Sequence, residues 1–291
     1  MGSEEPTPQH RSVISTLVVQ PIASVTGLLG STFFNVLEQV GYSFFLLMDA
    51  SKWVVRSIVQ GRVRMGRRAI VTQLVRVGVR SVVIVCLVSS CVGLILAFQL
   101  APPLDEFGSR DAVANIIGVA VLRELGPLIG AIVLTGFAGA SMAAEIGTMA
   151  VSEEIDALEA HALNPVRFLV VPRVIASMIA MAALAVLADI TAIAASLGVS
   201  VLVLDIPKAT YIQNTLDQVK AVDFLTGVAK AAVFGVLIGL IACSNGLRLV
   251  GTSAGAEGVG KATTATVVQS VVAIVIADLI FTAIFFAIRL T

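Results

Sequence analysis

Long uncharged runs, separated by short polar segments, are the dominant pattern of this chain. In the clearest of them, from Ser81 to Leu104, 24 consecutive residues carry no charge. A helix of about 20 such residues matches the roughly 30 Å hydrocarbon core of a bilayer. The pattern therefore predicts an all-α integral membrane protein with five transmembrane helices, at about 82–101, 125–147, 174–203, 224–246 and 264–288.

The charges beside these runs predict which way the helices cross. Basic residues next to a span mark its cytoplasmic end, and eight of them precede the first run: Lys52, Arg56, Arg62, Arg64, Arg67, Arg68, Arg76 and Arg80. The same side also receives Arg11, Arg167, Arg173, Arg248 and Lys261, whereas the opposite side receives only Arg110, Lys208, Lys220 and Arg289. We therefore expect a cytoplasmic N-terminus and, after five crossings, a C-terminus on the outer side.

The residues before the first span divide into two parts. Residues 1–30 begin with a polar, acidic stretch unlike a signal peptide, and we expect a flexible tail. Residues 31–80 predict interfacial amphipathic helices, and the arginines of 67–80 can meet lipid phosphates. Within 31–60 the apolar residues recur every three or four positions, at Phe33, Phe34, Leu37, Val40, Phe44 and Leu47. A poor transmembrane span over 31–60 is the alternative.

The apolar stretch 112–149 is too long for one crossing, since a straight helix of that length would reach roughly 57 Å. Pro127 removes a backbone donor and clashes with the preceding turn, which predicts a break at Arg123–Pro127. We expect residues 112–122 to form an outer re-entrant or interfacial piece, and the second span to begin at about residue 125.

The composition narrows the function classes. Hydrophobic residues make up 57% of the chain and charged residues 13%, against about 25% charged in soluble domains. A net charge of zero argues against nucleic acid as a partner. The three cysteines lie in apolar runs and are expected to pack rather than to ligate, and no Cys/His cluster predicts a metal site.

A glycine-rich segment, Gly255–Ala262, imitates a phosphate-binding loop. It matches the spacing G-x-x-x-x-G-K, but Ala262 stands where a Ser or Thr hydroxyl would hold magnesium. Apolar runs flank it on both sides, so it does not follow a strand of a soluble α/β unit. We expect a tight cytoplasmic turn there and no ATP hydrolysis by this chain.

The polar segment between the second and third spans predicts a short helix over 152–164. Ser152 is the expected N-cap, and Glu153 and Glu154 suit the positive end of the helix dipole. Ile155, Leu158 and Ala162 form an apolar stripe. Such a helix, held between two spans, suits docking into a groove of another protein. The alternative is a loop helix buried against its own bundle.

Ionisable residues at membrane depth are costly and are functional candidates by default; they are Arg123, Glu124, Glu145, Asp189, Lys230 and Asp278. We expect Arg123 and Glu124 to face an outer cavity and Asp189 to pair with Lys230, while Asp278 closes a contact in the bundle. Small residues crowd the second span, and they fit either packing within one chain or a dimer seam.

Three motifs, in this order, resemble the MlaE/YrbE permeases: RELGPLIGAIVLTGFAGASMAAEIGTM (123–149), SEEIDALEAHALNPVRFLVVPR (152–173) and GAEGVGKATTATVV (255–268). The resemblance implies that residues 81–291 form the permease domain of an ABC transporter that moves phospholipids between the inner and outer membranes. It implies a homodimer in the bacterial inner membrane, a cytoplasmic ATPase that binds ATP and magnesium, a periplasmic MCE-domain protein and, in many relatives, a STAS-domain protein. The chain itself would bind no cofactor and would not be an enzyme.

The resemblance also suggests roles for particular residues. Arg123 and Glu124 match positions near the lipid-binding cavity of the family, and we add Leu125, Leu96 and Phe98 as expected apolar contacts of the lipid. The segment 152–164 matches the helix that couples to the ATPase, with the expected contacts Glu153, Glu154, Ile155, Asp156, Leu158 and Glu159. One departure is Phe137, which stands where the family usually has arginine.

Two other functions are compatible with the residues alone. An ion-gradient-driven secondary transporter would use Asp189, Lys230 or Asp278 as coupling groups. A non-transporting membrane scaffold would only anchor soluble partners.

Overall fold

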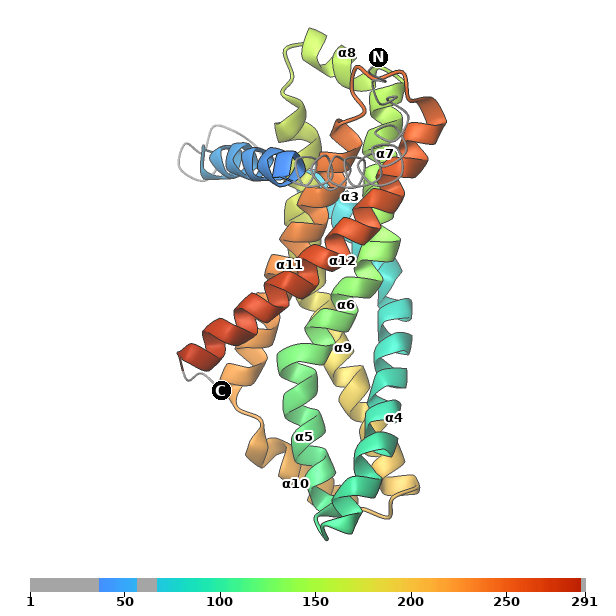
Figure 1. Ribbon diagram of the computed structural model, residues 1–291, viewed down its shortest axis with the longest axis vertical. Coiled ribbons are helices and arrows are strands. Elements are labelled where there is room, and N and C mark those ends of the chain that lie inside the picture. The colour runs from blue at the N-terminus through green and yellow to red at the C-terminus, as the bar shows by residue number, and fades with distance from the viewer. Residues whose placement is uncertain (1–36, 57–66, 289–291) are drawn as a thin grey trace, which may run out of the picture. The chain divides into compact units, whose positions relative to one another are not determined.

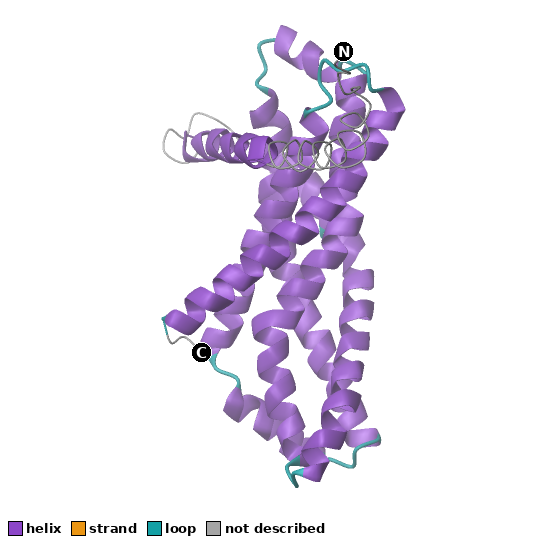
Figure 2. Cartoon of the chain, viewed as in Figure 1, coloured by secondary structure: helices purple, strands orange, loops and turns teal. Residues whose placement is uncertain are grey.

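The computed structural model describes residues 37–56 and 67–288 (Figure 1). Those residues form helices joined by short connections and contain no strand (Figure 2), which confirms the all-α prediction. The chain divides into two units at Leu47 and Met48. In the first unit, residues 37–47 are helical and Phe44 is exposed, while Phe33 and Phe34 of the expected amphipathic helix lie outside the described residues.

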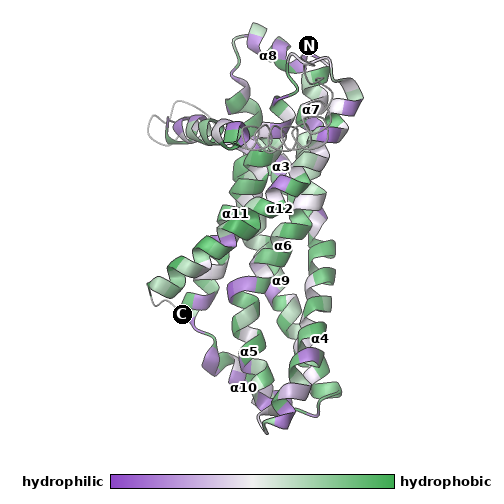
Figure 3. Ribbon diagram, viewed as in Figure 1, coloured by the Kyte–Doolittle hydropathy of each residue, from purple (hydrophilic) through white to green (hydrophobic). Residues whose placement is uncertain are grey.

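The second unit contains five helical stretches long and apolar enough to cross a membrane, as predicted. Hydrophobic residues cover most of these long helices, and hydrophilic residues gather near their ends (Figure 3). Each stretch exceeds its predicted span by several residues; their bounds are Arg68–Glu106, Val113–Val151, Val166–Leu202, Ala221–Leu247 and Gly255–Ala287. The cytoplasmic or outer position of each end stays a prediction.

The first stretch combines α3 (Arg67–Val77) with α4 (Val82–Glu106) through a short 3-10 turn. Pro102 and Pro103 directly follow the predicted span 82–101, but α4 continues through them and they lie inside its last two turns. A proline removes one backbone N–H hydrogen bond from a helix and clashes with the preceding turn. Near the end of a helix, few backbone hydrogen bonds follow the proline, so few can be disrupted. The basic helix α3 packs against α9 (Val171–Leu202), with Val77 in the core.

The second stretch is one continuous helix, so the break expected at Arg123–Pro127 is wrong. Its segments α5 (Val113–Ala120), α6 (Gly126–Leu134) and α7 (Ala140–Val151) are joined by π-helical turns at Val121–Leu125 and Thr135–Gly139. In the first turn the N–H of Gly126 reaches back five residues to the carbonyl of Val121. This wider turn accommodates the missing donor of Pro127 without ending the helix.

The core of the second unit centres on α9, which packs against α4, α6 and α11 (Ala221–Leu247). Glycines allow these close approaches, as membrane helices require. A Cβ on Gly93 of α4 would overlap the carbonyl oxygen of Ala192, and one on Gly235 of α11 would overlap that of Ser177.

Two short helices lie at opposite ends of this bundle, α8 (Glu154–Ala160) and α10 (Lys208–Gln218) (Figure 1). The predicted N-cap of α8 is wrong. Ser152 instead ends α7, and its Oγ donates to the carbonyl of Thr148 at 2.7 Å. Because α7 uses the backbone of Ser152, the chain turns at Glu153, with φ of 60°, before α8 begins.

The glycine-rich segment is also not a tight turn. Gly255–Ala262 forms the first two turns of α12 (Gly255–Ala287), and an i,i+4 ion pair between Glu257 and Lys261 at 2.7 Å supports them. Most backbone N–H groups of these turns serve the helix, so the segment has none of the open loop that cradles phosphate.

Candidate functional site

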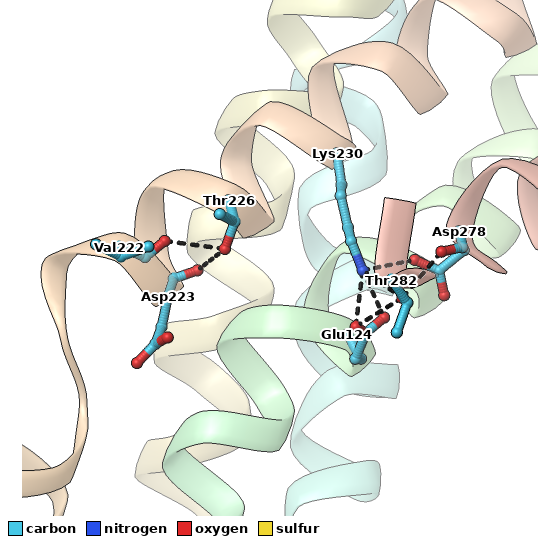
Figure 4. Close-up of polar contacts among 7 residues, drawn as sticks. All are labelled: Glu124, Val222, Asp223, Thr226, Lys230, Asp278 and Thr282. Atoms are coloured by element: carbon cyan, nitrogen blue, oxygen red, sulfur yellow. Dashed lines mark hydrogen bonds and ion pairs between the residues drawn. The ribbon is translucent and has the colours of Figure 1, made fainter. Parts of the chain in front are cut away.

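A buried lysine connects three of the long helices. Lys230 of α11 is 1% exposed, and its Nζ donates to both carboxylate oxygens of Glu124, each at 2.7 Å. It also reaches Oδ1 of Asp278 at 3.1 Å and Oγ1 of Thr282 at 3.0 Å, both on α12. Figure 4 shows these four side chains pointing toward one another. We call this set, Glu124, Lys230, Asp278 and Thr282, the lysine cluster.

This arrangement corrects one expectation and agrees with another. Lys230 does not pair with Asp189, because Glu124 and Asp278 occupy its donors instead. Asp278 does close a contact within the bundle. A buried ammonium in hydrocarbon needs compensating charge, and the two carboxylates supply it with one negative charge in excess when all three groups are ionised.

A second ion pair ties the π-helical turn to the start of α11. Nε of Arg123 donates to Oδ1 of Asp223 at 2.6 Å, and Asp223 is 1% exposed. The other oxygen of Asp223 accepts the backbone N–H of Lys220 at 2.9 Å, which caps α11 (its first turn is drawn in Figure 4). Arginine has five donors, so this pairing leaves others for a ligand.

These charges form the polar part of a cavity of about 500 Å³, which we call the charged cavity. Arg123, Glu124 and Lys230 lie beside the apolar side chains of Val119 and Phe285. Its full lining is Asn115, Ile116, Val119, Ala120, Arg123, Glu124, Gln218, Thr226, Lys230, Thr282 and Phe285. The volume is within the range of small-molecule sites. Charged groups beside apolar walls suit the headgroup and first carbons of an amphiphile.

The π-helical turn gives this cavity its charges. It brings both Arg123 and Glu124 to the cavity, while the neighbouring Leu122 faces away from it. α11 can approach the turn closely because residue 227 is glycine, where a Cβ would overlap the carbonyl oxygen of Leu122. The expected position of Arg123 and Glu124 beside a cavity therefore agrees with the structure, although its predicted cause, a helix break, does not.

The structure does not bring the other expected lipid contacts to this cavity. Leu96 packs against a buried cluster that contains Ala97 and Tyr211, Phe98 is 51% exposed, and Leu125 is partly buried. The sequence reasoning missed lining residues on the same helix, such as Asn115, Ile116 and Val119. Val119 lies four residues before Arg123, and Ile116 and Asn115 lie three and four residues before Val119. This helical spacing would have found them if the helix had been treated as continuous.

The expected ATPase contacts lie together on and beside α8. Ile155 is buried and Leu158 is half-buried, while Glu153, Glu154, Asp156 and Glu159 are exposed. One apolar residue thus anchors α8 to its own chain, where it packs on α7. The acidic side chains stay open to solvent.

Phe137 lies in the second π-helical turn and is 44% exposed. It lines a small cavity of about 60 Å³ together with Arg76 and Arg80. Arg76 also forms an ion pair with Glu145 at 2.8 Å, and Glu145 in turn pairs with the buried Arg173 at 3.2 Å. Cations from the first stretch therefore lie next to Phe137, the position at which the resemblance to the family implies an arginine.

Among residues 37–56 and 67–288, no three His, Cys, Asp or Glu side chains are grouped as metal ligands.

Comparison with known proteins identifies the family. The family model "Permease MlaE" matches residues 70–284. A probable ABC transporter permease protein of Rickettsia prowazekii is 36% identical over 217 residues, which cover 75% of this chain and 83% of that protein. A probable ABC transporter permease protein of Synechocystis is 35% identical over 76% of this chain and 82% of its own length.

A plant protein is also similar. The chloroplastic protein trigalactosyldiacylglycerol 1 of Arabidopsis thaliana is 35% identical over 80% of this chain and 65% of its own length. The region matched by the family model includes the π-helical turn and the lysine cluster, since both lie within residues 70–284. Together with the five apolar helical stretches, the match shows that this multi-pass membrane chain belongs to the MlaE family of ABC transporter permeases.

Proposed function

We propose that this chain moves phospholipids between the inner and outer membranes of a bacterium, and so maintains the lipid asymmetry of the outer membrane. The observation that carries the proposal is the charged cavity, where Arg123 and Glu124 lie beside apolar walls, within a helical stretch long and apolar enough to cross a membrane. A lipid phosphate can accept hydrogen bonds from Arg123, and an amino headgroup can donate to Glu124. A relative named after a galactolipid supports glycerolipids as the cargo class.

Energy reaches the cavity from a separate ATPase. An ABC transporter permease requires an ATPase partner, which binds ATP and magnesium, and we place its docking site on the segment 152–164. α8 follows directly after α7, whose helix continues through both π-helical turns to Arg123 and Glu124. A push on α8 can therefore move the second stretch along its axis and change the shape of the cavity.

A second copy of the chain fits the exposed apolar surface of α12. Its residues Val268, Val272, Val275, Ile276 and Leu279 are each more than half exposed. α12 also supplies Thr282 and Phe285 to the charged cavity, so a homodimer joined along α12 would bring two cavities near one seam. We further propose an MCE-domain protein on the periplasmic side and a STAS-domain protein on the ATPase. The complex would lie in the inner membrane.

The two rival functions make different predictions. A secondary transporter needs coupling groups free to exchange ions. Of its three candidates, Lys230 and Asp278 are engaged with each other, whereas Asp189 has an oxygen without a partner among the described residues. The family, however, uses ATP. A scaffold would bind the ATPase without moving lipid.

The test is lipid transfer in proteoliposomes that contain this chain and its ATPase, with fluorescent phospholipid and an acceptor MCE protein. We expect transfer that requires ATP and survives collapse of the proton gradient. Leu158→Asp should abolish ATPase binding and transfer together, whereas Val203→Asp, at an exposed apolar residue just beyond the C-terminal end of α9 and outside the segment 152–164, should leave ATPase binding unchanged. Transfer that persists without ATPase would contradict the proposal, and ATPase binding without any transfer would favour the scaffold.

A further inference from the structure

A second cavity, of about 420 Å³, lies on the other side of the π-helical turn. α9, α10 and the start of α11 form it, and Leu122 lines it while Arg123 and Glu124 line the charged cavity. The two cavities share no lining residue. We call this one the apolar cavity, because aliphatic and aromatic side chains such as Ile190, Ile193 and Phe224 cover most of its wall.

The shape of the apolar cavity favours an extended molecule. It follows α9 from Val186 to Leu197, a distance of about 16 Å at the helical rise per residue. Its volume is again that of a small-ligand site. A slot of this length and volume, with walls of this kind, fits one alkyl chain better than a compact polar molecule.

Two of its polar side chains are already occupied. The hydroxyl of Tyr211 pairs with Oγ of Ser196 at 2.6 Å, and Oγ1 of Thr215 donates to the carbonyl of Tyr211 at 2.9 Å. Burial raises the pKa of the Tyr211 phenol above its usual value, so the group stays neutral. Neither side chain introduces a charge into the cavity.

Asp189 is the exception. It is 3% exposed, it lines the cavity, and its Oδ1 has no hydrogen-bond partner among the residues that the structure describes. Its carboxylate lies against the backbone of Gly126, where a Cβ would overlap it. Lys230, the expected partner, is held in the lysine cluster. A buried carboxyl group without a donor is costly. Its Oδ1 is packed against Gly126, so a ligand in the cavity would reduce that cost by donating to the other carboxyl oxygen, which is turned away from Gly126.

We infer that the apolar cavity binds a single-chain amphiphile whose amino or hydroxyl group donates a hydrogen bond to Asp189. The alkyl chain lies along α9, between α10 and the start of α11. The site is separate from the lipid cargo site, and its occupancy does not depend on ATP. Asp189 lies near the Val186 end of the slot, so the polar group occupies that end and the chain extends toward Leu197.

The test uses fluorescence quenching in the full chain, reconstituted in lipid nanodiscs. The sequence has a single tryptophan, Trp53, so the double substitution Trp53→Phe and Phe224→Trp leaves one fluorophore, at the wall of the cavity. Three brominated probes of equal chain length are titrated: a primary amine, an alcohol and the methyl ester of the fatty acid. We expect the amine and the alcohol to quench at concentrations at least tenfold lower than the ester.

Substitutions at Asp189 test whether its carboxyl group causes the preference for the amine and the alcohol. Asp189→Leu should remove the tenfold preference, and Asp189→Asn, which keeps the shape and can donate to an ester carbonyl, should narrow it. Ser200→Ala removes another buried hydroxyl without a described partner on the same helix, outside the cavity, and should leave the preference unchanged. Equal quenching by all three probes, or a preference that survives both Asp189 variants, would overturn the inference. Lipid transfer with ATP is a separate readout, so failure here leaves the proposed function standing.

Discussion

The third and fifth apolar stretches have similar composition but are attached to the molecule in different ways. The chain itself buries 67% of the most apolar window of the third stretch and only 11% of that of the fifth. α9 is held by close backbone approaches at glycines of its neighbours. α12 packs on α7 and α11 through a narrower apolar face that includes Ile274. It adds polar contacts, through Asp278 and Thr282 to Lys230 and through Thr266 and Gln269 to Asn245.

This difference follows from the solvent. In a bilayer the hydrophobic effect does not drive helices together, so van der Waals packing and interhelical hydrogen bonds must do it. α9 is held mainly by van der Waals packing, and α12 depends more on interhelical hydrogen bonds. A helix held by a few polar contacts can shift when one of them changes, and α12 also lines the charged cavity. We therefore expect α9 to stay in place and α12 to shift when the charged cavity changes shape.

The largest effect is expected at the glycine contact of α9. Gly235→Leu should destabilise the fold by about 3 kcal/mol or more, because its side chain would meet the backbone of Ser177 and Met178. Thermal unfolding in detergent measures it. Gly198→Leu is the matched control, since no atom lies within 4 Å of a Cβ at that position on α9 itself. If both variants lost the same amount of stability, the close contact at Gly235 would not be the cause of the loss.

The next effect concerns the lysine cluster. Lys230→Met should cost about 2 kcal/mol, since it leaves the carboxylates of Glu124 and Asp278 without their cation. This free-energy cost is lower than that of breaking a fully buried ion pair, because the side chain of Glu124 is 35% exposed. Urea unfolding and ATP-driven lipid transfer are the measurements.

A triple variant is the control for this prediction. Lys230→Met with Glu124→Gln and Asp278→Asn removes the unpaired charges, so it should recover most of the stability but not the transfer. If the triple variant transfers lipid normally, the charges are only structural.

A smaller effect is expected at the other polar contact of α12. Asn245→Leu removes the hydrogen bonds that its Nδ2 donates to Thr266 at 3.0 Å and to Gln269 at 2.7 Å, and should cost about 1 kcal/mol. Hydrogen exchange should show faster opening of α12 with no change in α9. Equal acceleration in both helices would contradict the separate attachment of α12.

The sequence predicted the features that depend on local composition. It did not predict the features that depend on which residues of other helices lie nearby. Apolar runs predict all five stretches, and charged residues inside those runs identify Arg123, Glu124, Lys230 and Asp278 as candidates without any knowledge of their contacts. Proline chemistry alone predicted a break at Pro127, but the wider turn at Val121–Leu125 resolved the clash within the helix. Asp189 and Lys230 have opposite charges, yet helix packing gave Lys230 two other carboxylates.

Nor could hydropathy distinguish α9 from α12, since burial depends on which other helices cover an apolar face. The same limit applies to the lipid contacts. The apolar character of Leu96 and Phe98 makes them candidate lipid contacts, whereas the charged cavity takes its apolar wall from residues such as Val119 and Phe285 on other helices.

The smallest effect on stability is expected on the exposed face of α12, and it tests what covers that face. Val272→Phe should change the free energy of unfolding by less than about 0.5 kcal/mol, because the side chain is 52% exposed. Ile274→Phe, two residues away and fully buried, should cost about 2 kcal/mol through overpacking. If a second copy covers this face, Val272→Phe should nevertheless lower the dimer fraction in chemical crosslinking and reduce lipid transfer in proportion. An unchanged dimer fraction would mean that lipid covers the face of α12 around Val272, and the seam would then have to be sought on another helix.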